Sequence, residues 1–158
     1  MNSVNFVRGK HSVGLNEYHI EWCPKYRYNC MKNEYINKEI ERLIRRAAEE
    51  HRIIIKTIAV GFDHVHVRAA LPFTMSPSKA SMLLKGRSAY LIFRRFPNFR
   101  LRYPKGSFWS PGTFIRSISE VTSEVVHDYI EKQQFQRLER NLKENDGMFG
   151  QQSLEVFF

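Results

Sequence analysis

Residues 52–71 read RIIIKTIAVGFDHVHVRAAL, two β-rich runs separated by Gly61-Phe62-Asp63. β-branched residues dominate the first run, and apolar and polar residues alternate in the second. A short connection that contains glycine is typical of a β-hairpin. We therefore predict an antiparallel pair of strands at residues 52–60 and 64–70, and the rest of the fold is worked out around this pair.

The second strand of this hairpin presents two histidines on one face. Alternation directs Val65, Val67 and the apolar residues that follow at the same spacing into the core. His64 and His66 then lie side by side on the opposite face, where two imidazoles can share a cation. Asp63 has the opposite parity, so we leave it out of the ligand set and expect it to cap the loop.

The other elements follow from hydrophobic periodicity and from capping signals. Asn33 is a candidate N-cap for one helix, and Ser76-Pro77 opens another. In chain order we expect strand 15–22, helix 34–50, strands 52–60 and 64–70, helix 77–97, strand 108–118, and a helix from a capping box at Ser117 and Glu120 to about Gln134. This order predicts an α+β fold of the ferredoxin-like or RRM-like kind, an antiparallel sheet of four to five strands with helices packed on it.

Composition restricts the class of protein. The chain has 158 residues, 42% of them hydrophobic, which suits one domain with its own core. Its net charge of +9 implies an anionic partner, nucleic acid before membrane. It has no apolar run near the ~18 residues of a membrane span. Arg8 and Lys10 stand where a secretory signal would be apolar, so we expect a cytoplasmic protein in which Cys23 and Cys30 are free thiols.

Two further polar residues share a face of the third predicted helix. Tyr129 and Gln133 are four residues apart, and Val125 precedes them at the same spacing. A helical Tyr is more often an aromatic at the edge of an apolar stripe, and a helical Gln is more often solvated. With His64 and His66, however, the two could form a metal-assisted nucleophilic site. Two imidazoles and an amide oxygen leave coordination positions open, as catalytic metal sites do, and ligand softness favours Mn²⁺ or another transition ion over Mg²⁺.

Four segments in this order resemble the single-tyrosine HUH transposases of the insertion sequences numbered 200 and 605. They are Trp22-Cys23-Pro24-Lys25-Tyr26-Arg27, His64-Val65-His66, Phe108-Trp109-Ser110-Pro111-Gly112-Thr113-Phe114, and Tyr129 with Gln133. The resemblance covers about residues 10–134. It implies that His64, His66 and Gln133 bind a divalent metal ion, Mg²⁺ or Mn²⁺. It also implies that Tyr129 attacks single-stranded DNA, leaving a 5′-phosphotyrosine and a free 3′-OH.

The resemblance also implies partners and a division of the chain. Residues 1–134 would be the catalytic and DNA-binding domain, and residues 135–158 a tail with no assigned role. The protein would bind single-stranded DNA folded into a hairpin at transposon ends. It would act as a homodimer whose sheets join, with residues 105–113 as the edge strand. The basic residues expected to contact DNA phosphates are Arg8, Lys10, Lys25, Arg27, Lys79, Lys85 and Arg87.

Two alternatives remain at this stage. One keeps HUH chemistry but assigns it to a domesticated transposase or a replication initiator. The other is a nonenzymatic RRM-like RNA-binding protein, which would carry aromatic residues on its two central strands. If residues 53–60 and 64–70 are those strands, the sequence argues against it, because they contain no Phe, Tyr or Trp.

Overall fold

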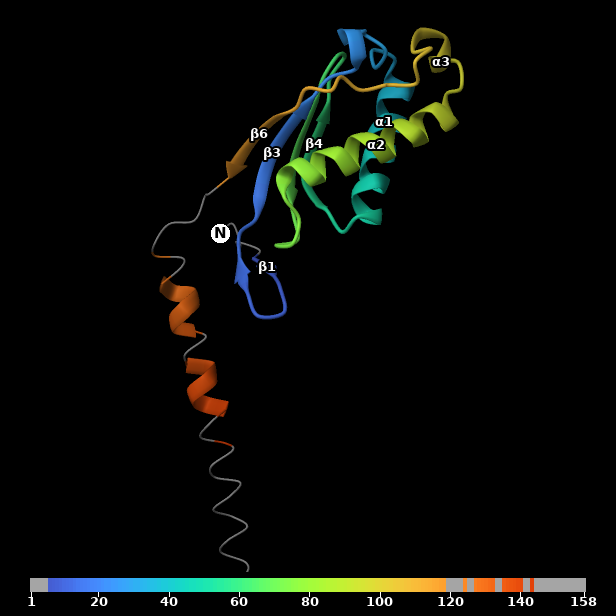
Figure 1. Ribbon diagram of the computed structural model, residues 1–158. Coiled ribbons are helices and arrows are strands. Elements are labelled where there is room, and N and C mark those ends of the chain that lie inside the picture. The colour runs from blue at the N-terminus through green and yellow to red at the C-terminus, as the bar shows by residue number, and fades with distance from the viewer. Residues whose placement is uncertain (1–5, 119–123, 125–126, 133–134, 141–142, 144–158) are drawn as a thin grey trace, which may run out of the picture. The chain divides into compact units, whose positions relative to one another are not determined.

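A computed structural model gives the structure of the protein (Figure 1). The residues that it describes are 6–118, 124, 127–132, 135–140 and 143. The chain divides into two compact units, Met1–Ser119 and Glu120–Phe158, and each is described by itself. In the described part, no helix has the length and apolar character needed to cross a membrane.

The first unit is built on a four-stranded antiparallel sheet. Its strands are β3 (Glu17–Trp22), β4 (Ile54–Val60), β5 (Val65–Ala70) and β6 (Phe114–Ile118). They lie in the order β4-β5-β3-β6, so β5 and β3 are central (Figure 1). The antiparallel hairpin predicted around Gly61 is confirmed as β4 and β5. The fold is α+β, as predicted.

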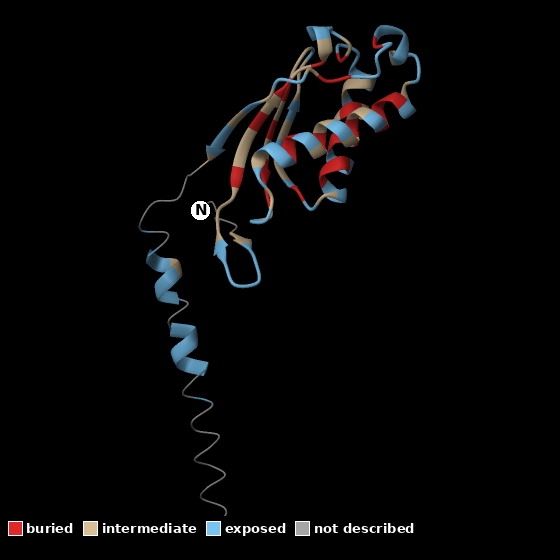
Figure 2. Ribbon diagram, in the orientation of Figure 1, coloured by how far each residue is buried: buried red, intermediate tan, exposed pale blue. Residues whose placement is uncertain are grey.

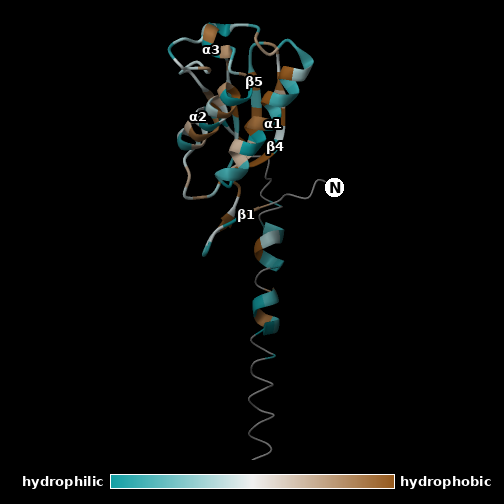
Figure 3. Ribbon diagram, turned by 90° about the vertical axis from the view of Figure 1, so that its right-hand side faces the viewer, coloured by the Kyte–Doolittle hydropathy of each residue, from teal (hydrophilic) through white to brown (hydrophobic). Residues whose placement is uncertain are grey.

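Two long helices pack together beside this sheet, α1 (Glu34–Glu50) and α2 (Pro77–Arg95). Both predicted caps are confirmed: the Asn33 side chain accepts a hydrogen bond from the Ile36 amide, and Ser76 accepts one from Lys79. Each helix carries hydrophobic and hydrophilic residues around its turns (Figure 3). The buried residues gather where the helices and the sheet face each other (Figure 2).

Short elements complete the described part of the first unit, and the sequence did not predict them. They are the two-stranded sheet of β1 (Val7–Arg8) and β2 (Val13–Gly14), the 3₁₀ turn η1 (Lys25–Arg27), and α3 (Phe99–Arg102). In the second unit, residues 127–132 and 135–140 are helical.

The predicted strand at 108–118 is wrong in its first half. Only Phe114–Ile118 forms a strand, and Trp109 makes an isolated bridge with Pro24. Within the single chain residues 105–113 form no strand beyond that bridge, and their pairing with a second copy stays a prediction. Side chains of α2 hold this segment instead: the Trp109 indole donates to Ser88 Oγ at 2.9 Å, and Lys85 Nζ donates to two backbone carbonyl oxygens in it. The strands predicted at 15–22 and 52–60 begin two residues too early, and the strand predicted at 64–70 begins one residue too early.

The face of the sheet away from the core presents polar side chains on both central strands. In the β3–β5 register, Glu21 lies opposite His66 and His19 opposite Arg68, whereas Ile20 and Val67 on the other face are buried. The expectation that residues 53–60 form a central strand is wrong, because β4 lies at the edge of the sheet. The argument against an RRM-like RNA-binding protein still holds for the true central strands, β3 and β5. Tyr18 and Trp22 of β3 lie on the same face as buried Ile20, and the open face of the two strands bears no Phe, Tyr or Trp.

Candidate functional site

His66 lies near the middle of the open face of the sheet. It belongs to β5 and pairs with Glu21 of β3 on one side and Ala59 of β4 on the other. Its neighbours Val65 and Val67 are fully buried, whereas 36% of the His66 side chain is exposed. The predicted alternation along this strand is therefore confirmed, and a central strand supports the imidazole.

His64 stands next to His66, just before β5 begins. The centroids of the two imidazole rings are 4.8 Å apart, and the rings are nearly perpendicular. Gly61 makes room for His64: a Cβ at that position would lie 2.8 Å from His64 Cε1 and 2.9 Å from Nε2. A side chain at this position would displace the His64 ring, because the ring packs closely against the backbone of the turn.

Asp63 contacts His64 rather than only closing the turn. Its Oδ1 lies 2.8 Å from His64 Nδ1, and Arg27 Nε donates to its Oδ2 at 3.1 Å. The hydrogen bond with His64, together with the nearby Arg27 guanidinium, lowers the pKa of Asp63 below its usual value. The expected role as a loop cap is thus replaced by contacts that fix the His64 ring and the basic turn η1.

Two residues that the sequence analysis did not single out, Glu21 and His19, complete the cluster. Glu21 Oε1 lies 2.9 Å from His66 Nδ1 and 2.9 Å from His19 Nε2, and the two nitrogens are 3.3 Å apart. A signal was available: His19 and Glu21 alternate with buried Ile20 and Trp22, so strand periodicity places both on the polar face. Their proximity to His66 depends on the pairing of β3 with β5, which the local sequence does not specify.

The orientation of the paired imidazoles suits a divalent cation. Each of His64 and His66 has Nδ1 within hydrogen-bond distance of a carboxylate. Among residues 6–118, neither Nε2 has a hydrogen-bond partner, which leaves both nitrogens available as ligands. A histidine that binds a metal through one nitrogen usually donates its other N–H to a carboxylate or carbonyl oxygen. His19, Glu21 and His66 also bring three ligand atoms within 4.8 Å of one another.

The predicted nucleophile and the third predicted ligand belong to the second unit. Tyr129 is described there, within helical residues 127–132, in agreement with the predicted helix. Gln133 lies outside the described residues. The structure therefore brings together His64 and His66 of the predicted site, and the roles of Tyr129 and Gln133 stay predictions.

The predicted DNA-binding residues differ in how they are engaged. Arg8, Lys10 and Lys79 are exposed, and Lys25 is half-buried. The remaining three have protein partners: Arg27 pairs with Asp63, Arg87 pairs with Glu50, and Lys85 binds carbonyl oxygens near Pro111. Burial lowers the pKa of Lys85 below its usual value. Contact with DNA stays a prediction for all seven.

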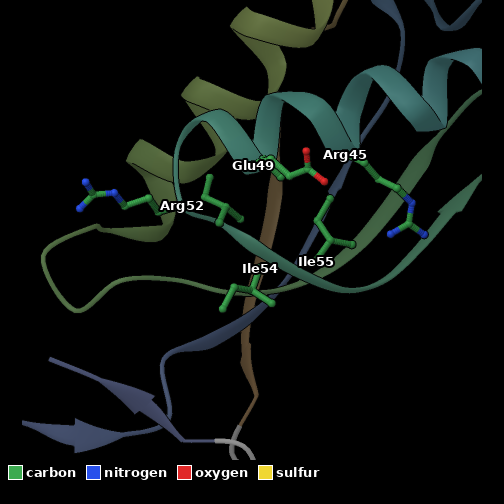
Figure 4. A pocket seen from close by; sticks show the side chains of 7 residues that line it. Arg45, Glu49, Arg52, Ile54 and Ile55 are labelled. Carbon is green, nitrogen blue, oxygen red and sulfur yellow. The ribbon is translucent and has the colours of Figure 1, made fainter.

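A surface groove lies away from the histidine cluster. It runs between the C-terminal end of α1 and the start of β4, and its labelled lining residues are Arg45, Glu49, Arg52, Ile54 and Ile55 (Figure 4). It contains none of the predicted site residues, so we do not assign it to the candidate site.

Comparisons with known proteins agree on one family. The family model described as "Transposase IS200 like" matches residues 12–133. The chain is 32% identical to the ISDra2 transposase TnpA of Deinococcus radiodurans over 131 residues, which is 82% of this chain and 92% of that protein. It is 27% identical to the transposase for insertion sequence element IS200 of Salmonella typhimurium over 117 residues, 74% of this chain and 76% of the relative.

A solved structure supports the same assignment. A crystal structure described as a transposase from Deinococcus radiodurans R1 superposes with a TM-score of 0.65 at 26% identity, covering 80% of this chain and 97% of that one. With a family model that spans residues 12–133, the sequence, the fold and the relatives show that this chain belongs to the IS200-like transposases.

Proposed function

We propose that this transposase cleaves and rejoins single-stranded DNA at transposon ends through a covalent 5′-phosphotyrosine on Tyr129. His64, His66 and Gln133 would hold a divalent cation, Mg²⁺ or Mn²⁺. The observation that carries the proposal is the pair of adjacent imidazoles at and just before the start of central strand β5, each with Nδ1 within 2.9 Å of a carboxylate oxygen and with Nε2 available. Membership of a transposase family supports it.

The chemistry asked of Tyr129 is a balanced exchange of phosphodiesters. A bond forms between Tyr129 Oη and the phosphorus as the bond to the DNA 3′-oxygen breaks. The phenol loses its proton, and the departing 3′-oxygen gains one. The new linkage keeps the phosphodiester, so a DNA 3′-OH can attack it in the reverse sense without ATP.

The remaining roles fall to residues that bind and orient. When bound, the cation would withdraw charge from a nonbridging phosphate oxygen as the displacement proceeds. His64 and His66 would supply imidazole ligands, and Gln133 would supply an amide oxygen. Exposed basic residues such as Arg8, Lys10 and Lys79 would neutralise DNA phosphates. As in the family it resembles, the protein would work as a homodimer on DNA hairpins.

Replacing the nucleophile tests this proposal. We expect Tyr129→Phe to abolish the covalent protein–DNA adduct while hairpin binding stays within about twofold of the original, since only the attacking oxygen is removed. The adduct is measured on a denaturing gel with labelled single-stranded element ends, and binding by fluorescence anisotropy. Tyr26→Phe is a matched control, because Tyr26 is an exposed tyrosine outside the proposed site. An adduct that survives in Tyr129→Phe would assign the nucleophile elsewhere.

A further inference from the structure

The two nitrogens of the His66 ring have different surroundings. Nδ1 lies 2.9 Å from Glu21 Oε1, an ion-pair distance, and forms a hydrogen bond with His19 Nε2 at 3.3 Å, and the same carboxylate oxygen lies 2.9 Å from His19 Nε2. All three side chains lie on central strands and are partly shielded, with exposed fractions of 27% for His19 and 36% for both Glu21 and His66. Nε2 is the nitrogen left for a cation.

Glu21 and His19 favour opposite tautomers of His66. An ionised carboxylate only accepts hydrogen bonds, so Glu21 favours the tautomer in which Nδ1 carries the proton and the lone pair sits on Nε2. His19 Nε2–H, in contrast, can donate to a deprotonated Nδ1 and would leave the proton of His66 on Nε2, where it blocks metal binding. The lone pair of Nδ1 would then also face the carboxylate oxygen at 2.9 Å, which is repulsive.

We propose that Glu21 is a positioning residue that selects the Nδ1–H tautomer of His66. It does so in two ways: it accepts the Nδ1–H of His66, and it also accepts the Nε2–H of His19, which would otherwise select the wrong tautomer. This inference rests on the proposed function in one respect, that His66 is a metal ligand. Asp63 has the equivalent place for His64, with Oδ1 at 2.8 Å from Nδ1.

Glu21 would therefore affect cation binding by orienting the proton of His66, and it would not itself be a ligand of the cation. Carboxylates that support metal-binding histidines typically change metal affinity by about 10- to 100-fold when they are removed. We therefore expect Glu21→Leu to weaken Mn²⁺ binding by about that factor. Glu21→Gln should fall between Glu21→Leu and the original chain, because the amide oxygen still accepts hydrogen bonds but carries no negative charge to strengthen them.

Because Glu21 and His19 favour opposite tautomers of His66, removing both residues should affect metal binding differently from removing Glu21 alone. In the Glu21→Leu background, a further His19→Leu substitution removes the donor that stabilises the wrong tautomer. The double variant should therefore bind Mn²⁺ more tightly than Glu21→Leu alone, by at least about threefold, although it has lost one more polar group. A role for the two residues in packing or in direct ligation predicts a further loss instead.

The experiment reads the tautomer directly in metal-free protein. ¹⁵N chemical shifts of labelled histidine side chains distinguish Nδ1–H from Nε2–H, and His51 is an internal control because its Nδ1 lies 2.7 Å from the Ala47 carbonyl oxygen, outside the site. We expect His66 to be Nδ1–H in the original chain and predominantly Nε2–H in Glu21→Leu, with the His51 signals unchanged. Electron paramagnetic resonance of Mn²⁺ gives the affinity and the number of ions bound.

Two results would overturn the proposal. One is a His66 that keeps Nδ1–H in Glu21→Leu, with Glu21→Gln as the conservative check if the leucine variant does not fold. The other is a second Mn²⁺ bound per chain that disappears in both glutamate variants, which would make Glu21 a ligand. The tautomer measurement needs no cleavage, so it remains decisive if His66→Ala proves active and the proposed metal role of His66 fails.

Discussion

Gly61 shows how one residue governs the position of a candidate ligand. A methyl group on its Cα would lie within 3 Å of two atoms of the His64 ring. The backbone of β5 after the turn is held by its pairing with β4, so the methyl group would have to displace the His64 imidazole. Misplacement of a ligand by about 1 Å is enough to impair a catalytic site severely.

We expect Gly61→Ala to reduce Mn²⁺ affinity and the rate of DNA cleavage by at least about tenfold. The matched control is Gly112→Ala, because a Cβ at Gly112 would meet nothing within 4 Å. Manganese titration followed by electron paramagnetic resonance measures the affinity. Equal affinities in the two variants would show that the packing of His64 on Gly61 does not position the ligand.

The residue-scale features that the sequence could predict are those that depend on local alternation. The placement of His66 on the open face, opposite in parity to Val65 and Val67, needs only the strand period. Glu21 reaches His66 through pairing between strands separated by more than forty positions, as the register shows. Strand alternation therefore predicts which face of the sheet Glu21 lies on, but it does not predict that Glu21 contacts His66.

At the scale of elements, α2 continues through a glycine whose Cβ position is empty. Gly86 lies in the interior of the helix, and no atom lies within 4 Å of where a Cβ would stand. Alanine would lower the conformational entropy of the unfolded chain without a steric cost. We expect Gly86→Ala to raise the free energy of unfolding by about 0.5–1 kcal/mol, measured by urea denaturation. Gly106→Ala is the contrasting control and should be destabilising, because Gly106 has a φ of 77°. A free energy of unfolding that is unchanged or lower in Gly86→Ala would show that helix propensity does not decide the stability at this position.

The two long helices are also joined by an ion pair that depends on pH. Glu50, the last residue of α1, accepts hydrogen bonds from Arg87 of α2 at 2.6 and 3.2 Å. These hydrogen bonds, with a smaller contribution from Arg46, lower the pKa of Glu50 below its usual value. A carboxyl group whose pKa is lower in the folded state stabilises the fold above its unfolded pKa of about 4.3, and this stabilisation is lost as pH falls through the folded pKa.

We therefore expect Glu50→Gln to be destabilising at pH 7 and nearly neutral at pH 3, relative to the original chain at the same pH. Urea denaturation at both values measures the difference. Glu49→Gln changes the net charge equally and is the control, since the Glu49 side chain makes no ion pair with a described residue. A Glu50→Gln effect that does not depend on pH would mean that packing, and not charge, joins the helices at this point.

Capping and periodicity explain why some elements could be predicted closely. The bounds expected for α1 match those observed, because Asn33 caps a long, regular apolar stripe. Residues 108–113 resembled a strand because they are rich in aromatic residues, but Phe108 and Trp109 are buried by tertiary packing. Long-range packing overrode β-propensity in that segment.

At the scale of the whole molecule, the two halves of the proposed chemistry fall in different units. His64 and His66 belong to Met1–Ser119, and Tyr129 belongs to Glu120–Phe158. In a homodimer, Tyr129 could then serve either the histidines of its own chain or those of the partner chain. The resemblance to HUH transposases favours the second arrangement, in trans, for at least the first cleavage step.

A mixed dimer separates the two arrangements. One chain carries His64→Ala and its partner carries Tyr129→Phe, with different tags to purify the pair. If each site is built within one chain, both sites have a defect and the dimer is inactive. If the site is shared, the intact Tyr129 of one chain meets the intact histidines of the other, and one working site is restored.

We expect this mixed dimer to form about half as much adduct as the original dimer at saturating DNA, because one of its two active sites is intact. The reciprocal control places both substitutions in one chain opposite an unchanged partner: it keeps one working site if assembly is within a chain and none if assembly is shared. Activity in the reciprocal dimer alone would therefore refute the shared site, and both dimers must bind the hairpin for the comparison to hold.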